Sequence, residues 1–398
     1  MNSGILALEL PQGWRISPEV ERLWPALVSL RRDLHQHPEL SGEERRTQAV
    51  VLGALSEAGV PARPIGRTGV LGRIAGRAPG PTLLLRADMD ALPIEEDTGL
   101  SFQSLVPGAM HACGHDAHVA MLLGAAQVLQ AAPPARGDVL LCFQPAEERG
   151  AGAAELLQAG LLSEPVDRAL AFHVWSPLPL GQVGIRPGPA MASVDSFRLV
   201  VHGRGTHAAT PEDGVDPIAA AAQIITAAQT LVARRIAPYQ AAVLSFTRMQ
   251  GGTTYNVLPE QVELLGTIRS FDRPVRDLLV GELESLAAGI ARGLGARTTF
   301  EIVEHLPCLV NDPAVARAFA EVAAAVVGPE AVFAPPPIMG GEDFGLVLER
   351  VPGAMIWLGC GNPAQGAAFS HHHPRFTIDE RVLLLGVELA ACFARKEL

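Results

Sequence analysis

The sequence predicts an α/β protein in which one domain is built from two separated segments and a second, α+β domain is inserted between them. The chain has 398 residues, which exceeds the usual size of a single hydrophobic core. In its first half, strand-like apolar runs alternate with helical patterns. Between residues 193 and 304 the order of elements becomes β-α-β-β-α-β, which matches the ferredoxin-like split unit. We therefore expect a main domain over residues 1–188 and 305–398, and an inserted domain over residues 189–304.

The main domain is expected to begin with helices and to continue with buried strands. Apolar residues at helical spacing predict one helix over Pro18–Arg32 and another over Glu43–Ala58. A helix rich in Ala, Leu and Val is expected over His118–Ala131. The predicted strands are Val70–Ala75, Thr82–Arg86, Asp138–Phe143 and Ala169–Val174. Residues 375–398 have the pattern of a strand end followed by a terminal helix.

The inserted domain combines alternating patterns, typical of half-buried strands, with two long helical stretches. Its strands are expected over Ser193–His202, Ala242–Gln250, Gln261–Ser270 and Thr298–Glu304. Its helices are expected over Pro217–Arg235 and Arg273–Leu294.

The stretch Met110–His118 concentrates metal-binding chemistry in nine residues. It holds three imidazoles, one thiol and one carboxylate. Thiolate and neutral imidazole are good ligands for zinc and other divalent first-row metals. Cys113 and His115 flank a glycine, and this spacing lets both side chains converge on one ion, or on a close pair, from a loop. Asp116 and His118 remain to orient the ligands. Taken alone, the stretch also fits a polar loop with a buried cysteine.

Acidic pairs follow two of the predicted strands, at the end of a sheet where ligands collect in open α/β folds. Asp88 and Asp90 form the first pair, and because the loop is expected to turn there, only one of them should approach a metal closely. Glu147 and Glu148 form the second pair. Two adjacent glutamates after a buried strand are costly unless they are paired or bind a cation, so one can ligate metal while the other handles a proton. The alternative for the first pair is turn-forming aspartates, and for the second it is a solvated acidic turn.

Further imidazoles lie elsewhere in the chain. His173 falls inside a predicted strand, where a lone histidine is more often a satisfied core residue. The run Ser370-His371-His372-His373-Pro374 supplies three more, and it is followed by 24 further residues, so it is not a terminal affinity tag.

Composition narrows the class of protein. The net charge is −11 and there is no basic run, which argues against a nucleic-acid partner. The longest apolar runs are broken by polar residues, so no membrane span is expected. The first 14 residues lack the charged and apolar regions of a signal peptide. Five scattered cysteines do not suggest a disulfide framework, and a cytoplasmic location is expected.

Seven motifs occur in the order found in one known enzyme family. They are Arg86–Pro93, Met110–His118, Gln144–Glu148, Gly205–His207 with Pro211 and Gly214–Pro217, Tyr255–Pro259, Gly341–Phe344 and His372–Pro374. Together they resemble the peptidase M20 family of metallohydrolases. The likeness spans nearly the whole chain and is greatest to the amidohydrolase branch of hippurate hydrolases, N-acyl-amino-acid amidohydrolases and plant auxin-conjugate hydrolases.

The resemblance implies a zinc-peptidase-like catalytic domain that holds two divalent metal ions per subunit. By motif match, the ligands are Cys113, His115, Glu148, His173 and His372. Glu147 takes the position of the general base. The residues expected to support the ligands are Asp88, Asp90, Asp116 and His118. A thiolate favours zinc, whereas imidazole and carboxylate also suit manganese, cobalt or nickel, so the identity of the metal stays open.

The resemblance also implies that residues 189–304 form a lid and dimerisation domain, and hence a homodimer or a higher homo-oligomer. His207 and Asn256 match lid positions that reach substrate in related enzymes, often from the partner subunit. Arg269 follows Asn256 by thirteen residues, a spacing similar to that of an asparagine and an arginine that hold the substrate carboxylate in related aminoacylases.

Three places blur or depart from the family pattern. The histidine run leaves the ligand ambiguous among His371, His372 and His373, and His372 is chosen because the usual ligand precedes the proline by two residues. Thr377 stands where an aspartate is common, and Gly341 where a serine is common. Either change could alter the edge of the pocket.

The implied reaction is hydrolysis of the amide bond of a small N-acyl amino acid, such as a hippurate-like or N-acetyl conjugate. A water bridging the two metals would attack the carbonyl, with Glu147 as general base. The metals and His207 would stabilise the oxyanion, and Arg269, assisted by Asn256, would hold the carboxylate. The alternatives are a dipeptidase or carboxypeptidase of the same family, and a non-catalytic relative that binds a small ligand or metal. The intact Glu147 argues against the last.

Overall fold

The structure, a computed structural model, describes residues 9–398. The expected absence of a signal peptide concerns residues 1–14, and residues 1–8 of that stretch lie outside the described residues. The chain divides into two compact units. The first contains the residues up to Gly188 together with Val310–Pro336 and Leu346–Leu398, and the second contains Pro189–Leu309 and Pro337–Gly345. The second unit is therefore larger than the predicted insert, because residues 305–309 and 337–345 pack with it.

The first unit is organised around a mixed sheet that has eight strands within residues 9–398. The strands are β1 (Ala62–Ile65), β2 (Gly69–Ala75), β3 (Thr82–Asp88), β4 (Asp138–Gln144), β5 (Arg168–Pro179), β6 (Val183–Gly184), β15 (Val332–Phe333) and β16 (Gly353–Gly361). Their order across the sheet is β1-β2-β4-β3-β5-β16-β6-β15. The central strands β4, β3, β5 and β16 run parallel to one another. Parallel strands buried on both faces have near-continuous apolar sequences, as these do.

Helices pack around this sheet. They are α1 (Pro18–Glu21), α2 (Trp24–Gln36), α3 (Arg45–Glu57), α4 (His115–Ala131), α5 (Gly152–Gln158), α8 (Pro313–Val327) and α10 (Val382–Glu397). Helix α4 packs against β3, α2 and α10, and nearly all of its residues are buried. A Cβ at Gly124 would lie 2.7 Å from Val387 and 2.8 Å from Leu27, so a glycine there allows α4 to approach both neighbouring helices. The packing fixes the start of α4 against the sheet. The short elements β7 (Gly188–Met191), β14 (Leu309–Asn311) and α9 (Gly345–Leu348) lie where the chain crosses between the units.

The parallel register brings several chain segments to one edge of the sheet. Pairing of β3 with β4 aligns Asp88 with Gln144. Pairing of β3 with β5 aligns Arg86 with Ala171, two residues before His173. The carboxyl ends of parallel strands are where open α/β sheets bind ligands, and the acidic pairs lie there.

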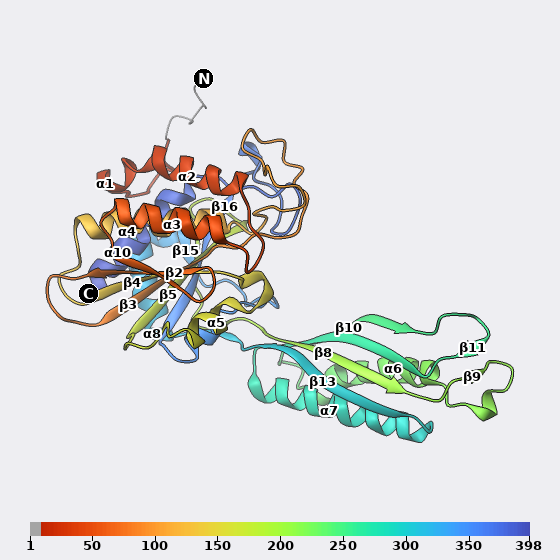
Figure 1. Ribbon diagram of the computed structural model, residues 1–398. Helices are drawn as coiled ribbons and strands as arrows, with labels where there is room; N and C mark the ends of the chain where they lie inside the picture. Colours follow the sequence, from red (N-terminus) through yellow and green to blue (C-terminus); the bar gives the residue numbers. More distant parts are fainter. Residues whose placement is uncertain (1–8) are drawn as a thin grey trace. The chain divides into compact units, whose positions relative to one another are not determined.

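The second unit has the ferredoxin-like arrangement. Its main elements are β8 (Ser193–His202), α6 (Pro217–Arg235), β10 (Ala242–Gly251), β12 (Gln261–Ser270), α7 (Arg273–Gly293) and β13 (Arg297–Leu306). The sheet order is β10-β12-β8-β13, with every neighbouring pair antiparallel. Its core joins the sheet to both helices through residues such as Phe197, Ile224 and Leu283. The predicted fold class, with its inserted α+β domain, is confirmed. Two short strands, β9 (Thr206–His207) and β11 (Val257–Leu258), pair beyond one end of the sheet (Figure 1).

Two expectations about individual elements are wrong. The helix predicted over Pro18–Arg32 is two helices, α1 and α2, because Pro25 lacks an N–H and its ring clashes with the preceding turn of a continuous helix. No strand end occurs after Arg375 within the described residues, and the buried strand of that region is β16 instead. All nine residues of β16 are buried, and a continuous apolar run has no periodicity that separates a strand from a helix.

Within residues 9–398, no helix is long and apolar enough to cross a membrane.

Candidate metal centre

The centre begins at a glycine that starts α4. Gly114 has a φ of +89°, in the left-handed region, and a Cβ there would lie 2.4 Å from Val174 Cγ2. A glycine is therefore required for both conformation and space. Cys113 precedes it in the loop, whereas His115 is the first residue of the helix, so only one of the two predicted loop ligands comes from a loop.

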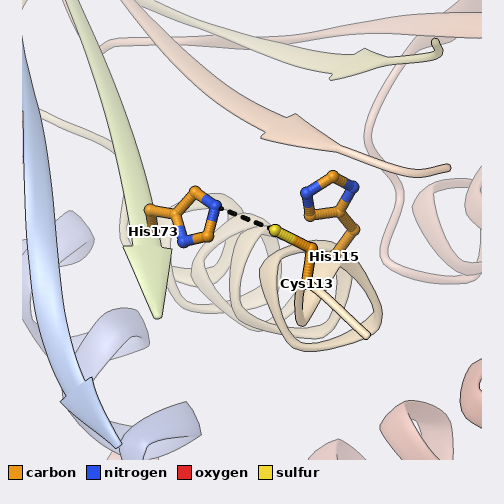
Figure 2. A group of neighbouring side chains, drawn as sticks. All are labelled: Cys113, His115 and His173. Carbon is orange, nitrogen blue, oxygen red and sulfur yellow. Dashed lines mark hydrogen bonds between the residues drawn. The ribbon is translucent and has the colours of Figure 1, made fainter. Parts of the chain in front are cut away.

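His173 reaches the same place from β5. Its Nε2 atom is 3.5 Å from Cys113 Sγ, and Figure 2 shows both side chains beside His115. The Nδ1–H of His173 donates to the Val174 carbonyl at 2.7 Å, which leaves Nε2 with its lone pair. Burial and the neighbouring His118 lower the pKa of His173, so the ring is neutral. His173 thus has the tautomer and charge of a metal ligand.

His115 is surrounded by acids. Asp88 Oδ2 lies 3.6 Å from its Nε2, and Asp90 Oδ1 lies 3.3 Å from its Nδ1, so both aspartates lie beside this ring. Burial alone would lower the pKa of His115, but Asp88, Asp90 and Glu148 raise it to about 10. A fully buried imidazole under this negative potential marks a place that favours a cation.

The two glutamates stand on a tight turn after β4. Glu148 Oε1 lies 3.8 Å from His115 Nε2, and Glu148 Oε2 lies 3.5 Å from His372 Nε2. Glu147 Oε2 lies 4.0 Å from His115 Nε2. Glu148 is therefore between two imidazoles, and Glu147 is at the side of the group.

The three consecutive histidines have three different environments. His372 faces Glu148, and its backbone has a φ of +64°, which is uncommon for a residue with a side chain. His371 Nε2 donates to the Val174 carbonyl at 2.9 Å, and burial lowers its pKa to about 4. His373 stacks on Phe369 with ring centroids 4.5 Å apart. Of the three, His372 is the one whose ring nitrogen lies among the other candidate ligands.

The donor set fits divalent cations. Three overlapping groups each have ligand atoms within 4.8 Å of one another: Cys113, His115 and His173; Cys113, Glu148 and His372; His115, Glu147 and Glu148. Nε2 of His115 and Oε1 of Glu148 are buried without a hydrogen-bond partner. Buried polar atoms without partners are rare, and a bound ion would satisfy these. Overlapping groups of sulfur, nitrogen and oxygen donors suit two adjacent ions of the zinc type.

The predicted supporting residues divide into two sets. Asp88 accepts from Arg86 Nη1 and His118 Nδ1, both at 2.5 Å, and His118 Nε2 accepts from the Val174 N–H at 2.9 Å. This series of hydrogen bonds links β3, α4 and β5 next to His115. Asp116 is turned elsewhere, with Oδ2 at 2.8 Å from both Arg31 Nε and His35 Nδ1.

The positively charged neighbours of Asp116 keep its carboxyl group ionised. Its burial would raise the carboxyl pKa, but Arg31 and His35 lower it, so it is ionised. Asp116 therefore anchors the start of α4 to α2.

The predicted substrate-contacting residues lie in the second unit, and two of them are neighbours. His207 in β9 pairs with Val257 in β11, and the Ala208 N–H donates to the carbonyl of Asn256 at 3.0 Å. Both His207 and Asn256 are exposed. The short β9–β11 ladder thus presents an imidazole and an amide side by side.

Arg269 lies in β12 of the four-stranded sheet and not in this two-stranded ladder. It is eight residues along β12 from Gln261, or roughly 26 Å at about 3.3 Å per residue. The β9–β11 ladder lies beyond the Gln261 end of β12, whereas Arg269 is near the other end of this strand. Arg269 Nη1 donates to the Met339 carbonyl at 3.0 Å and Nε donates to the Thr267 hydroxyl at 3.3 Å, so two of the five guanidinium N–H groups are used.

The departure at Gly341 has a local cause. A Cβ at this position would lie 2.3 Å from Val194 Cγ2. A serine would therefore require β8 or the segment around Gly341 to shift. Thr377 is buried, and nothing in the structure explains its replacement of an aspartate.

Sequence reasoning missed Ser41 and Glu44. The Ser41 hydroxyl donates to Asp90 Oδ2 at 2.6 Å, and Glu44 accepts from the Ala146 N–H at 2.9 Å. The Glu44 contact reaches the turn that carries the glutamate pair directly, whereas the Ser41 contact reaches it through Asp90, which accepts from the N–H groups of Glu147 and Glu148. The local pattern around Glu44 is that of an acidic helix start, so no signal along the chain indicated a contact 102 residues away.

Comparison with known proteins agrees with this geometry. The profile of peptidase family M20/M25/M40 matches residues 84–396. N-acetylcysteine deacetylase of Bacillus subtilis is 43% identical over 368 residues, covering 92% of this chain and 95% of the relative. Thermostable carboxypeptidase 1 of Saccharolobus solfataricus is 38% identical, covering 96% and 98%. The crystal structure of the Bacillus subtilis YXEP protein, described as a dinuclear metal binding peptidase, is 39% identical with a TM-score of 0.83, covering 94% and 98%.

Proposed function

Because the chain belongs to peptidase family M20/M25/M40, we propose that it is a metal-dependent amidohydrolase that releases the amino acid from a small N-acyl amino acid. The observation that carries the proposal is the glutamate pair. Glu148 faces two imidazoles at 3.5 and 3.8 Å, and the adjacent Glu147 faces the same His115 at 4.0 Å. One carboxylate is thereby available to a metal and its neighbour to a proton.

Two divalent ions per subunit complete the site. Cys113, His115, Glu148, His173 and His372 would hold them. When bound, such ions supply Lewis acidity, which polarises a carbonyl and makes water more acidic. The relative whose crystal structure is described as dinuclear supports the number of ions, and the mixture of thiol, imidazole and carboxylate supports zinc, manganese, cobalt or nickel.

The protein residues carry the proton transfers. Glu147 accepts a proton from the attacking water as the acyl carbonyl becomes tetrahedral, and it then protonates the leaving amine. Its backbone N–H is bound by Asp90 at 3.1 Å, so its position relative to the metal ligands is fixed by the main chain. His207 stabilises the oxyanion as a hydrogen-bond donor.

The second unit acts as the lid and dimerisation domain, over the predicted residues 189–304. His207 and Asn256 act on the active site of the partner subunit, whereas Arg269 acts within its own chain and binds the free carboxylate of the substrate. The separation of roughly 26 Å along β12 supports this division, because groups so far apart in one chain can meet at one substrate only if they come from two chains. The protein is a homodimer or a higher homo-oligomer.

A carboxypeptidase or dipeptidase is the second candidate. The relative of 38% identity from Saccharolobus solfataricus is named a thermostable carboxypeptidase, so the same chemistry with a different pocket is supported too. We also propose a cytoplasmic location, because Cys113 must remain a reduced thiol to bind metal.

An activity panel tests the proposal. The chelated protein, reloaded with zinc, manganese, cobalt or nickel, is assayed on N-acetyl-L-cysteine, N-benzoylglycine, an unblocked dipeptide and an N-blocked dipeptide. Metal-dependent release of the amino acid from the first two substrates is expected to be fastest. Faster cleavage of either dipeptide would show that the protein is a peptidase and not an amidohydrolase. No cleavage with any metal would contradict the proposal.

A further inference from the structure

The turn that carries the glutamate pair contains an unusual backbone conformation. Ala146 has a φ of +52° and a ψ of 38°, in the left-handed region. Within the described residues, His372 is the other non-glycine residue with a positive φ. This region is disfavoured when a Cβ is present. Such a conformation persists where the surrounding structure imposes it, and it occurs often at functional sites.

Three consecutive backbone N–H groups of this turn are bound by two carboxylates. The Ala146 N–H donates to Glu44 Oε1 at 2.9 Å. The N–H groups of Glu147 and Glu148 donate to the two oxygens of Asp90, at 3.1 and 3.0 Å. The two carboxylates together determine the path of the main chain through the turn.

The other side of the turn is closed by its own backbone. The carbonyl of Ala146 accepts from the N–H groups of Ala151 and Gly152, both at 3.2 Å. A Cβ at Gly152 would lie 1.6 Å from the Pro145 carbonyl oxygen, so the turn is packed without spare space there. The contact from Glu44 reaches the Ala146 N–H from outside the turn.

Glu44 is held for this contact. Its side chain is fully buried, Oε1 also accepts from the Gly42 N–H at 2.7 Å, and Oε2 accepts from the Thr68 hydroxyl at 2.6 Å. Burial raises the pKa of the Glu44 carboxyl, and these hydrogen bonds oppose the rise. Each carboxylate oxygen has a donor, so the side chain is fixed in one orientation.

We propose that Glu44 is a positioning residue, which holds Ala146 in its left-handed conformation and thereby sets where the side chains of Glu147 and Glu148 lie at the metal centre. A change of φ at Ala146 rotates the two residues that follow it, which are the general base and a metal ligand of the proposed function. Misplacement of about 1 Å can lower turnover 10²-fold, and loss of a group that supports a ligand lowers metal affinity or activity about 10–100-fold.

Substitutions of Glu44 distinguish the effect of its hydrogen-bond acceptor from the effect of its side-chain volume. Glu44→Met keeps the approximate volume but removes the acceptor, and kcat is expected to fall about 10–100-fold with KM within about twofold. Glu44→Gln keeps an oxygen for the Ala146 and Gly42 N–H groups and an amide for Thr68, so kcat is expected to stay within about threefold of wild type. Loss of activity in Glu44→Gln equal to that in Glu44→Met would overturn the proposal, as would full activity in Glu44→Met.

Glu39 provides a matched control in the same segment. Its carboxylate accepts from two backbone N–H groups, those of Arg46 and Thr47, at 2.9 and 2.8 Å, but it caps α3 and does not contact the turn. Glu39→Met is expected to lower the melting temperature while kcat stays within about twofold of wild type. An equal fall of kcat in Glu39→Met and Glu44→Met would mean that general damage to this segment, and not positioning of the turn, reduces activity.

Substitutions of Ala146 test the conformation itself. Glycine adopts positive φ without steric cost, so the double variant Glu44→Met with Ala146→Gly is expected to recover most of the lost kcat. If Glu44→Met fails to fold, the Ala146→Val variant provides the test, with Glu44 intact. A β-branched residue disfavours positive φ, so Ala146→Val should lower kcat at least tenfold. Ala146→Gly should not lower kcat to this extent. Wild-type kcat in Ala146→Val, or no recovery in a folded double variant, would refute the proposal.

A cobalt titration keeps this test separate from the proposed function. Binding of Co²⁺ to the chelated protein is followed by visible absorbance, without any substrate. Because Glu148 is on the turn that Glu44 contacts, Glu44→Met should weaken Co²⁺ affinity about tenfold or more. Glu44→Gln and Glu39→Met should leave Co²⁺ affinity unchanged. Unchanged Co²⁺ affinity in Glu44→Met would count against the inference even if the wild type hydrolyses nothing in the panel above.

Discussion

The two groups of candidate active-site residues are built in opposite ways. In the first unit, Cys113, His115 and His173 are 8%, 0% and 6% exposed and are fixed by contacts with one another and with buried carboxylates. In the second unit, His207 and Asn256 are exposed on a ladder of two-residue strands. Buried acids and imidazoles are stable only with partners or a cation, so the first group must be complete when its own unit folds.

The exposed group has a different requirement. A residue that contacts substrate only after closure, or from another subunit, must stay accessible until the complex forms. His207 and Asn256 satisfy this, because their main-chain hydrogen bonds hold the ladder while their side chains remain at the surface. Substitutions in the first group should therefore disturb metal binding and stability, and substitutions in the second should affect turnover and substrate binding but not metal binding or stability.

The largest effect is expected at Glu147. Glu147→Gln should lose about 10²–10⁴-fold in kcat and retain two metal ions, because it removes the general base and leaves the ligands. Glu148→Gln is the matched control, and it should lose metal under the same dialysis. Metal analysis together with single-turnover rates checks both variants, and the reverse pattern would exchange the roles of the two glutamates.

The next largest effect is expected at His207. His207→Ala should lower kcat about 10²–10³-fold, as loss of one oxyanion donor does, with no change in melting temperature because the side chain is exposed. Mixing this variant with Glu147→Ala under conditions of subunit exchange should restore about a quarter of wild-type activity, since half of the dimers are mixed and each has one intact site. Demonstrated exchange without recovery, or a strictly monomeric enzyme, would show that His207 acts within its own chain.

A smaller effect is expected from substitution of Arg269 or Asn256. Arg269→Ala should lower kcat/KM about 10–100-fold through a weaker hold on the carboxylate, and Asn256→Ala about tenfold. In a dimer of one Arg269→Ala chain and one Asn256→Ala chain, the site of the Asn256→Ala chain keeps its own Arg269 and receives Asn256 from the other chain. Mixing the two variants should therefore raise activity toward a quarter of wild type. If both residues act from the same chain, the mixture will be no more active than the two variants assayed separately.

The smallest effect concerns stability at low pH in the second unit. Asp195 is buried in the sheet, and His305 Nδ1 and Arg276 Nε each lie 2.9 Å from it. Burial would raise its pKa, but His305 and Arg276 lower it. A carboxyl with a lowered folded-state pKa stabilises the fold above its unfolded pKa of about 3.9, and this stabilisation is lost as the pH falls from there through the folded value.

Asp195→Asn checks this assignment. It should reduce the free energy of unfolding at pH 7 by about 1–3 kcal/mol and flatten its dependence on pH below about 4, with metal content unchanged. Urea unfolding from pH 3 to 7 measures the difference. Parallel pH profiles for the variant and the wild type would show that the Asp195 ion pairs do not contribute.

Much of the architecture was accessible to pattern reasoning. The four strands and two helices of the insert were predicted to within two residues at each end, because its half-buried strands alternate and its helices are amphipathic. The buried strand β16 was not predicted, because its sequence has no alternation. Apolar spacing alone predicts one helix over Pro18–Arg32, but Pro25 is tolerated only in the first turn of a helix and so separates α1 from α2.

Residue chemistry also indicated where the candidate site would be. A cysteine and a histidine two apart, and acids directly after buried strands, are local features whose chemistry and position at a strand end can be read along the chain. The direction in which a side chain points cannot be read in the same way. The motif predicts Asp116 as a support of the metal ligands but does not show that its carboxylate contacts Arg31 and His35, because the turn of α4 places successive residues on different faces.

Contacts between distant segments were decided by packing. Glu44 reaches Ala146 only after α3 packs on the sheet that contains β4. Asn256 precedes β12 and Arg269 is near the far end of that strand, so most of an extended strand separates the two residues. Local sequence specifies the type and period of each element, since these depend on neighbouring residues. Which side chains meet depends on how buried surfaces of remote elements fit together, and no local pattern contains that information.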